Sequence, residues 1–257
     1  RGAEVIRGGE GIDTAVFEGA SGQFGIAIDG DAVEVRDKTG GGLDFLDSVE
    51  RLEFADGLAL NAPGALDVAT LSGAAALTEA ELSTLVETYI AYFDRAPDAL
   101  GLLFWADAFA DGVSLQGIAD LFFAQDETQA KLPDENAALV TAAYRNLLER
   151  DPDESGRIFW TNALDTGAVT QGQFMLAVIE GARANPDGQG DVQTVENKAD
   201  IGIDYALFEG LTDAENAETV MAAYDRADPV ASLAAAAALT DGFAADAAPG
   251  AADPELT

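Results

Sequence analysis

The 257-residue sequence contains no cysteine and no histidine. Without cysteine the chain can form neither disulfide bonds nor thiolate zinc sites. Without histidine it can build no Ser-His-Asp triad, no Cys-His pair and no imidazole metal ligand. Carboxylates remain available for catalysis, but they are so numerous that no pair stands out by its spacing. We therefore expect a protein that is not an enzyme, and a carboxylate-based hydrolase is the less favoured alternative.

Basic residues and long apolar runs are also scarce. Thirteen Lys and Arg residues stand against 47 Asp and Glu residues, which gives a formal net charge of -34. A surface of this charge repels nucleic acid and anionic lipid, so neither is expected as a partner. The longest apolar stretches are short and rich in alanine, so no membrane span is expected. The acidity is typical of a chain that stays soluble in salt, with specific cation binding confined to a few positions.

The first 62 residues have the pattern of β-structure. Short apolar runs, such as Phe24 to Ile28 and Val33 to Val35, are separated by Gly, Asp and Ser. Asp29-Gly30 lies between these two runs, where a tight hairpin needs residues that tolerate positive φ. We expect a small antiparallel β region over residues 1–62.

From about residue 66 the apolar residues follow the period of a helix. Asn61-Ala62-Pro63-Gly64 is the natural boundary between the two parts. The predicted fold class is α+β, with the β region followed by a larger all-α domain over residues 63–243. Residues 244–257, rich in Ala, Pro, Gly and Asp, are predicted to form a flexible tail. The apolar face of the first predicted helix is formed by Leu82, Leu85, Val86, Tyr89, Ile90 and Phe93.

The helical part contains an internal duplication, which we assign to residues 82–127 and 137–182. In each copy a proline ends one helix, and the following aspartate caps the next helix. An arginine three residues before that aspartate can pair with it, and a tryptophan supplies a large buried anchor. These residues are predicted to define a turn between two helices rather than a ligand site. At an offset of 55 residues the matching pairs include Arg95 and Arg150, Pro97 and Pro152, Asp98 and Asp153, Gly101 and Gly156, and Trp105 and Trp160.

The pattern Tyr…Arg-x-Pro-Asp-x-x-Gly-x-x-x-Trp resembles the bacterial domain-of-unknown-function family numbered 4214. That family is similar to the linker-polypeptide domain of phycobilisomes, and its members are often attached to RTX proteins, S-layer proteins and other exported proteins. The resemblance spans about Leu82 to Phe243 and includes the stretch Asn197-Lys198-Ala199-Asp200-Ile201-Gly202. It implies a helical module of an exported protein, and it brings no catalytic residues with it.

A glycine-rich segment near the start resembles the calcium-binding nonapeptide of RTX proteins. Gly8 to Val16 matches G-G-x-G-x-D-x-U-x, with a weak alanine at the U position. The glycines of this motif free backbone carbonyls and the aspartate adds a carboxylate, which suits Ca²⁺. Gly9, Gly11 and Asp13 would form a half-site in the last turn of a β-roll that lies upstream in the same polypeptide. Val49 to Gly57 is similar to the ending that follows such arrays, and a plain Gly-rich turn is the alternative.

A second candidate calcium site overlaps the turn of the second repeat. Asp151, Asp153 and Ser155 place oxygens at positions one, three and five of an EF-hand-like loop, with Gly156 at position six. Position twelve is Asn162 instead of the bidentate glutamate of a strong site. The structural turn is therefore the preferred interpretation of this segment.

Together these features predict a non-catalytic accessory module of a secreted or cell-surface bacterial protein, exported by a one-step (type I) channel. The module is expected to act in export, surface attachment or assembly, with calcium-supported folding, beside upstream domains of the same polypeptide. An adhesin module that binds a glycan or a protein is the alternative. Exposure of Trp105 or Trp160 would favour binding, whereas burial would favour a structural role.

Overall fold

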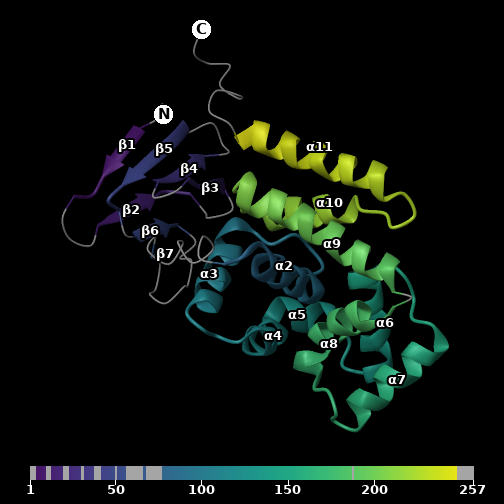
Figure 1. The fold of residues 1–257 in the computed structure, drawn as a ribbon. Coiled ribbons are helices and arrows are strands. Elements are labelled where there is room, and N and C mark those ends of the chain that lie inside the picture. Colours follow the sequence, from purple (N-terminus) through teal and green to yellow (C-terminus); the bar gives the residue numbers. More distant parts are fainter. Residues whose placement is uncertain are drawn as a thin grey trace.

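The computed structural model describes residues 4–9, 13–19, 23–29, 32–37, 42–49, 51–55, 66–67, 77–186 and 188–247. Strands come first in this part of the chain and helices follow, so the fold is α+β, as predicted. The strands are grouped at one end of the molecule, and the helices extend away from them (Figure 1).

The strands form two sheets. The first has the order β1 (Glu4–Arg7), β5 (Gly42–Asp47), β4 (Ala32–Asp37) and β3 (Phe24–Asp29). The second has the order β2 (Thr14–Phe17), β6 (Arg51–Phe54) and β7 (Leu66–Asp67). The predicted hairpin is confirmed, because β3 and β4 are antiparallel with Asp29 opposite Ala32. Its tip at Gly30 and the predicted boundary at residues 61–64 lie outside the described residues. Because β7 pairs with β6, the β region extends to Asp67, past residue 63 where the all-α domain is predicted to begin.

Two strand pairs are parallel, although the β region is predicted to be antiparallel. β1 runs parallel to β5 and β2 runs parallel to β6, so the β1–β2 segment runs alongside the β5–β6 segment, with each strand hydrogen-bonded to its counterpart. The Gly8 amide donates to the Asp47 carbonyl at 3.1 Å, and the Arg51 amide donates to the Asp13 carbonyl at 3.0 Å. A Cβ at Gly8 would lie 1.9 Å from the backbone oxygen of Ser48, so the close approach of the two segments requires glycine there. Side chains alternate in the same way in both kinds of pair, so the pattern alone does not reveal the direction.

The helices form a larger part around α2, whose predicted apolar face is buried apart from the partly buried Leu82. No helix in the described ranges is both long enough and apolar enough to cross a membrane. The last helix continues to Ala247, past the predicted start of the tail at 244, because its alanines favour helix. The helices are α2 (Glu79–Phe93), α3 (Ala99–Ala110), α4 (Leu115–Phe123), α5 (Asp126–Lys131), α6 (Asn136–Leu148), α7 (Glu154–Asp165), α8 (Gln171–Ala184), α9 (Gln189–Ile203), the π-helical turn η3 (Asp204–Phe208), α10 (Ala214–Ala222) and α11 (Pro229–Ala247).

Helix α9 packs closely on α2. A Cβ at Gly202 would lie 2.8 Å from Val86 Cγ1 and 3.0 Å from Pro97 Cδ, so this glycine allows the two helices to approach. Close packing explains why a glycine ends the Asn-Lys-Ala-x-x-Gly stretch of α9.

The side chains of Lys131 in α5 and Lys198 in α9 reach the C-terminal ends of α2 and α6. Lys131 Nζ donates to the carbonyl of Phe93 at 3.0 Å, and Lys198 Nζ donates to the carbonyl of Asn146 at 2.6 Å. The side chain of Lys198 is only 3% exposed, and it also pairs with Glu149 at 2.5 Å. A positive charge at this end of a helix meets its unpaired carbonyls and its dipole. Each lysine therefore stabilises the end of the first helix of one repeat.

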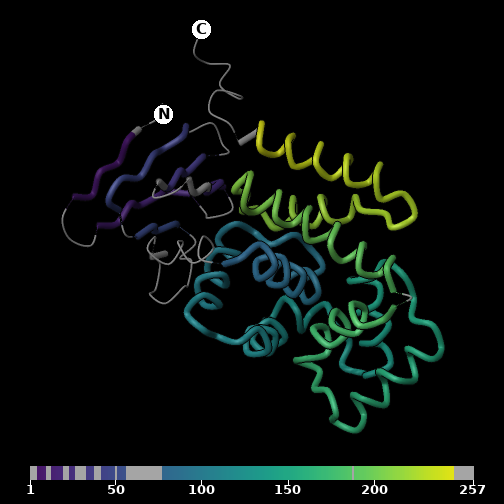
Figure 2. The backbone as a smooth tube through the Cα atoms, in the orientation of Figure 1, coloured from purple at the N-terminus to yellow at the C-terminus, as the bar shows by residue number. Residues whose placement is uncertain are grey.

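The strands and the helices share a core. Leu100 and Leu103 of α3 belong to the same buried cluster as Ile26 of β3. The Ile26 amide donates to the carbonyl of Gly210 at 2.6 Å, and the Thr212 hydroxyl donates to the carbonyl of Phe24. Figure 2 shows α3 beside the strands and the second repeat at the far end of the molecule. The β end is thus joined to the helices through α3 and the segment after η3.

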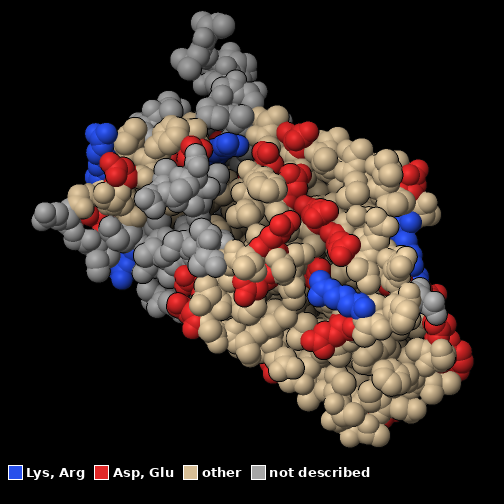
Figure 3. Space-filling model, viewed as in Figure 1, with Lys and Arg blue, Asp and Glu red and all other residues tan. Residues whose placement is uncertain are grey.

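Acidic side chains are spread over the helical part on the face shown in Figure 3, and basic side chains appear at few places on it. This distribution agrees with the net charge of -34. A negative surface disfavours polyanionic partners on this face.

Candidate functional site

The two repeat turns have matching backbones. α2 and α6 both end at a residue in the left-handed conformation, Asp94 with φ 51° and Glu149 with φ 50°. Asp98 and Asp153 then cap α3 and α7, each accepting from the amide three residues later at 2.7 and 2.8 Å. The aspartates therefore cap these helices, as the sequence predicts.

Glycines recur at equivalent places of both turns. Gly112 and Gly167 have φ of 95° and 70° at the ends of α3 and α7, a conformation that favours glycine. A Cβ at Gly101 would lie 2.9 Å from the capping carboxylate, and one at Gly156 would lie 2.9 Å from the hydroxyl of Tyr144. Both pairs of glycines are thus explained by the local geometry.

In the first repeat Arg95 makes the predicted pair with Asp98, at 3.4 Å. Its Nε and Nη2 also bind Glu127 of α5, at 2.9 and 3.2 Å. The guanidinium lies 5.2 Å from the ring centroid of Tyr89, whose hydroxyl donates to Asp98 at 3.0 Å. Burial raises the pKa of Tyr89, so its hydroxyl stays protonated and acts as a donor.

In the second repeat Arg150 has a different partner. It binds Asp191 of α9 at 2.9 and 2.5 Å, and Arg226 donates to the same carboxylate at 2.6 Å. Burial opposes ionisation of Asp191, but the hydrogen bonds from the two arginines outweigh it and lower the pKa of Asp191. The guanidinium of Arg150 lies 5.0 Å from the ring centroid of Tyr144, whose hydroxyl accepts from Trp160 Nε1 at 3.2 Å.

Each repeat turn opens into a pocket at the surface. The first-repeat pocket has a volume of about 420 Å³ and the second-repeat pocket about 430 Å³. Because their shared residues follow the 55-residue offset, the two pockets are related by the same duplication as the sequence. The equivalent residues that line the two pockets are Tyr89 and Tyr144, Phe93 and Leu148, Arg95 and Arg150, Gly101 and Gly156, Phe104 and Phe159, and Trp105 and Trp160.

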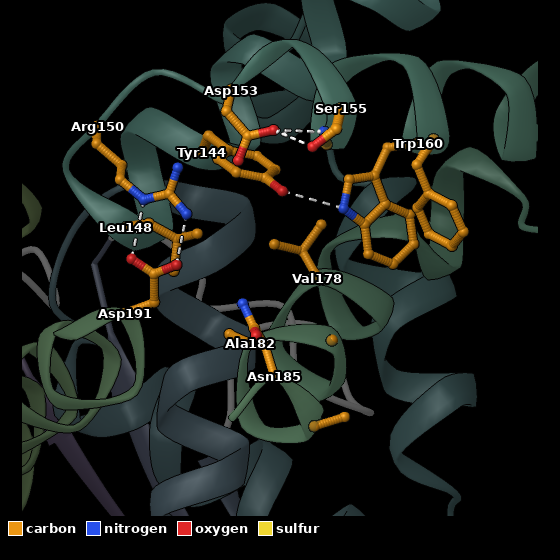
Figure 4. Close-up of a pocket in the computed structure, with 14 residues that line it drawn as sticks. Tyr144, Leu148, Arg150, Asp153, Ser155, Trp160, Val178, Ala182, Asn185 and Asp191 are labelled. Carbon is orange, nitrogen blue, oxygen red and sulfur yellow. Dashed lines mark hydrogen bonds and ion pairs between the residues drawn. The ribbon is translucent and has the colours of Figure 1, made fainter. Parts of the chain in front are cut away.

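In the second-repeat pocket, Arg150 and Trp160 lie on either side of Tyr144, and Val178 and Ala182 of α8 also line the cavity (Figure 4). A Cβ at residue 181, a glycine of α8, would lie 3.0 Å from the indole of Trp160. The missing side chain therefore lets the indole lie directly on α8.

Both tryptophans are half-buried. Trp105 meets Phe122 of the core edge-on with 4.9 Å between ring centroids, and Trp160 meets Phe174 in the same way at 5.5 Å. Each indole also lines its pocket. The sequence predicts buried anchors, whereas each indole packs on the core with one edge and lines a pocket with the rest of its surface.

The two copies differ in what covers their second helix. Leu100 and Leu103 of α3 are buried against the strands, whereas the matching positions of α7 hold Ser155 and Ile158, and Ile158 is 47% exposed. Phe159 keeps its aromatic ring although it is 63% exposed, and it lies 4.9 Å from the neighbouring indole. The second copy thus retains an exposed Phe159 ring in the wall of its pocket, next to the half-buried Trp160.

The predicted nonapeptide site is described only in part. Gly9 has φ of 103°, and Asp13 directly precedes β2. Gly11 lies outside the described residues. Over the described ranges, no group of three or more Asp and Glu side chains is placed to hold a metal ion. The nonapeptide site would use backbone carbonyls in addition to one carboxylate, and it stays a prediction.

The second predicted calcium site coincides with the cap of α7. Asp153 accepts from the hydroxyl of Ser155 at 2.6 Å in addition to its capping bond. Asp151 points to Arg145, with 2.7 Å between the paired atoms. These oxygens are engaged in the turn, which agrees with the preferred structural interpretation.

The carboxylates that hold the repeat arginines, Glu127 and Asp191, are absent from the predicted set, as is Arg226. Glu127 lies 32 residues after its arginine and Asp191 lies 41 residues after its own. Because the two partners do not share the repeat offset, the duplication gives no signal for them.

Residues 119–184 match a protein family described as Domain of unknown function (DUF4214). The matched segment begins in α4 and ends with α8, so it contains the second repeat turn. The match supports, for this segment, the family number that the turn pattern indicates. No curated protein and no solved structure matches the chain.

Proposed function

We propose that the chain is a non-catalytic accessory module of a secreted or cell-surface bacterial protein, acting in export, surface attachment or assembly. The observation that carries this proposal is the parallel pairing of β1 with β5 and of β2 with β6, with Gly8 at the contact between the two segments. Parallel stacking of short glycine-rich repeats is the architecture of calcium-binding β-solenoids. The match of residues 119–184 supports the family assignment of the helical part.

Calcium is the proposed cofactor of the β end, with Gly9, Gly11 and Asp13 as ligands. The positive φ of Gly9 is a conformation that glycine adopts readily, and it supports the proposed role of the motif's glycines. The segment of Asp151 is the weaker site, because its side chain already pairs with Arg145.

Titration calorimetry with CaCl₂, and thermal melts in CaCl₂ and in EGTA, test the calcium proposal. Saturating calcium at a hundred times the dissociation constant should stabilise the protein by about 2.7 kcal/mol. Asp13→Asn should abolish the response, and Asp151→Asn is the matched control that should keep it. A response lost only in Asp151→Asn would move the site to the repeat turn. No response in the unmodified protein would refute calcium-supported folding.

A binding module is the second candidate function, and the two repeat-related pockets favour it. Each pocket has a half-buried indole in its wall, and a volume within the usual range for small-molecule sites. Its ligand would be a glycan or a protein segment of the cell surface. Catalysis is not proposed, because the carboxylates beside the pockets serve as helix caps and arginine partners.

A further inference from the structure

We propose that the two repeat pockets are saccharide sites related by the duplication, each holding one sugar ring of an uncharged glycan against its tryptophan. This inference rests on the second candidate function, a binding module, and narrows its ligand to carbohydrate. Three features support it, namely a fixed aromatic wall, polar groups in the same cavity and the charge of the molecule.

The indole in the wall of the second-repeat pocket is held by two contacts within the protein. Trp160 is held by its hydrogen bond to the Tyr144 hydroxyl at 3.2 Å and by the edge of Phe174 at 5.5 Å. Phe159, 63% exposed, extends the apolar surface beside the indole. The C–H face of a pyranose ring packs on such a surface, and a wall that is already fixed loses little entropy on binding.

Polar groups line the same cavity. Asp153, Ser155 and Asn185 are exposed there, and the side chain of Arg150 is 32% exposed. Asp153 and Ser155 are bonded within the turn, and the second carboxylate oxygen and the hydroxyl lone pairs remain as acceptors. Asp191 and a backbone carbonyl hold Arg150 through three hydrogen bonds. A guanidinium has five N–H donors, so two remain for a ligand. Sugar hydroxyls both donate and accept, and they match this mixed set of donors and acceptors.

The first-repeat pocket repeats the wall with a different polar set. Phe104 and Trp105 supply its aromatic rings, and Gln125 and Glu127 join the arginine. The side chain of Arg95 is only 6% exposed, so it offers fewer donors than its counterpart in the second repeat. We therefore expect the first-repeat pocket to bind the same sugar more weakly.

The charges favour an uncharged ligand. The chain carries a net charge of -34, which repels polyanionic glycans. Around the second-repeat pocket, Arg150 and Arg226 face two carboxylates, Asp153 and Asp191, so the charges balance locally. An anionic sugar would gain no net attraction there.

The chain contains two tryptophans, one in each pocket, so a variant that keeps a single tryptophan reports on one site by its intrinsic fluorescence. Trp105→Phe leaves Trp160 as the reporter, and Trp160→Phe leaves Trp105. Both variants would be titrated with linear hexasaccharides of β-1,4-glucose, β-1,3-glucose and β-1,4-N-acetylglucosamine. At least one of these sugars should give a saturable change in both variants, with the tighter binding reported by Trp160.

Phe159→Ser tests whether the wall makes contact with the sugar. It should weaken the binding reported by Trp160 at least tenfold, which corresponds to about 1.4 kcal/mol, without lowering the melting temperature. Ile158→Ser is the matched control, because Ile158 is the preceding residue, is 47% exposed and does not line the pocket. Equal effects of the two variants would overturn the proposed contact.

A lysine–tyrosine hexapeptide serves as the probe for the competing ligand class. Saturable binding of this peptide, with no response to the three sugars, would overturn the saccharide assignment and keep the binding-module function. No response to sugars or peptide would overturn both. Neither outcome affects the calcium proposal, which is measured at the β end.

Discussion

Replacing Gly202 by alanine would place a methyl group between α9 and α2. The new Cβ would lie 2.8 Å from Val86 Cγ1, 3.0 Å from Pro97 Cδ and 3.3 Å from Ile90 Cδ1. Val86 has one preferred rotamer in a helix, and the ring of Pro97 cannot rotate away. The contact is therefore relieved mainly by moving α9 away from α2.

The size of the effect follows from two opposing contributions. Adding a methylene-sized group to a well-packed core costs about 1–3 kcal/mol. Alanine in a helix interior is more favourable than glycine by up to about 1 kcal/mol. The net change expected for Gly202→Ala is a loss of about 1–2 kcal/mol of unfolding free energy. A chain of this size then melts about 3–6 °C lower.

Scanning calorimetry of Gly202→Ala and Gly242→Ala measures both contributions. Gly242 lies in α11, and no atom lies within 4 Å of a Cβ built there, so only the helix preference acts and the melting temperature should rise. Val86→Ala in the Gly202→Ala background should recover part of the loss, as a double-mutant cycle would reveal. An equal rise for both glycine replacements would refute the close approach of α9 to α2.

Two buried carboxylates and one leucine give the remaining predictions. The pKa of Asp191 is lowered, so the stability that its ionised form contributes is complete above its unfolded pKa of about 3.9 and is lost as the pH falls through the folded pKa. In urea unfolding, the unfolding free energy of Asp191→Asn should therefore fall less steeply with decreasing pH than that of the unmodified protein. Burial raises the pKa of Glu87 although Arg183 lowers it, so the unmodified protein should lose stability relative to Glu87→Gln as the pH rises from about 4.3 through the folded pKa. A difference that does not vary with pH would contradict the corresponding argument. Leu103→Ala should lower the unfolding free energy by about 2–5 kcal/mol and speed amide exchange in β3 more than in α7. Equal acceleration in both would argue against a core that joins α3 locally to the strands.

The parts of the fold that depend on neighbouring residues could be predicted from the sequence. An N-cap needs only the aspartate and the amide three residues later, so Asp98 and Asp153 could be assigned as caps from their position alone. The apolar period of α2 likewise revealed its buried face. The pairing of Arg150 with Asp191 could not be predicted, because the two residues lie 41 positions apart and the chain offers many carboxylates.

The pockets could be predicted only in part. The repeat offset identified both tryptophans, but their half-buried position depends on Phe122 and Phe174, which lie 52 residues apart instead of 55 and so leave the repeat register. The aligned copies do contain one signal that the second helix of the second copy is exposed. Leucine at position 100 becomes serine at position 155, which is typical of a helix that is covered in one copy and open to solvent in the other.

Amine-directed reagents will find few targets on this protein, which has three lysines. Lys198 is 3% exposed, and its nitrogen is held by a carbonyl and by Glu149. Acylation of this amine requires α9 to separate from the end of α6, so the rate of its labelling measures how often that interface opens. Labelling of Lys198 therefore reports local opening of the helical domain at the end of α6.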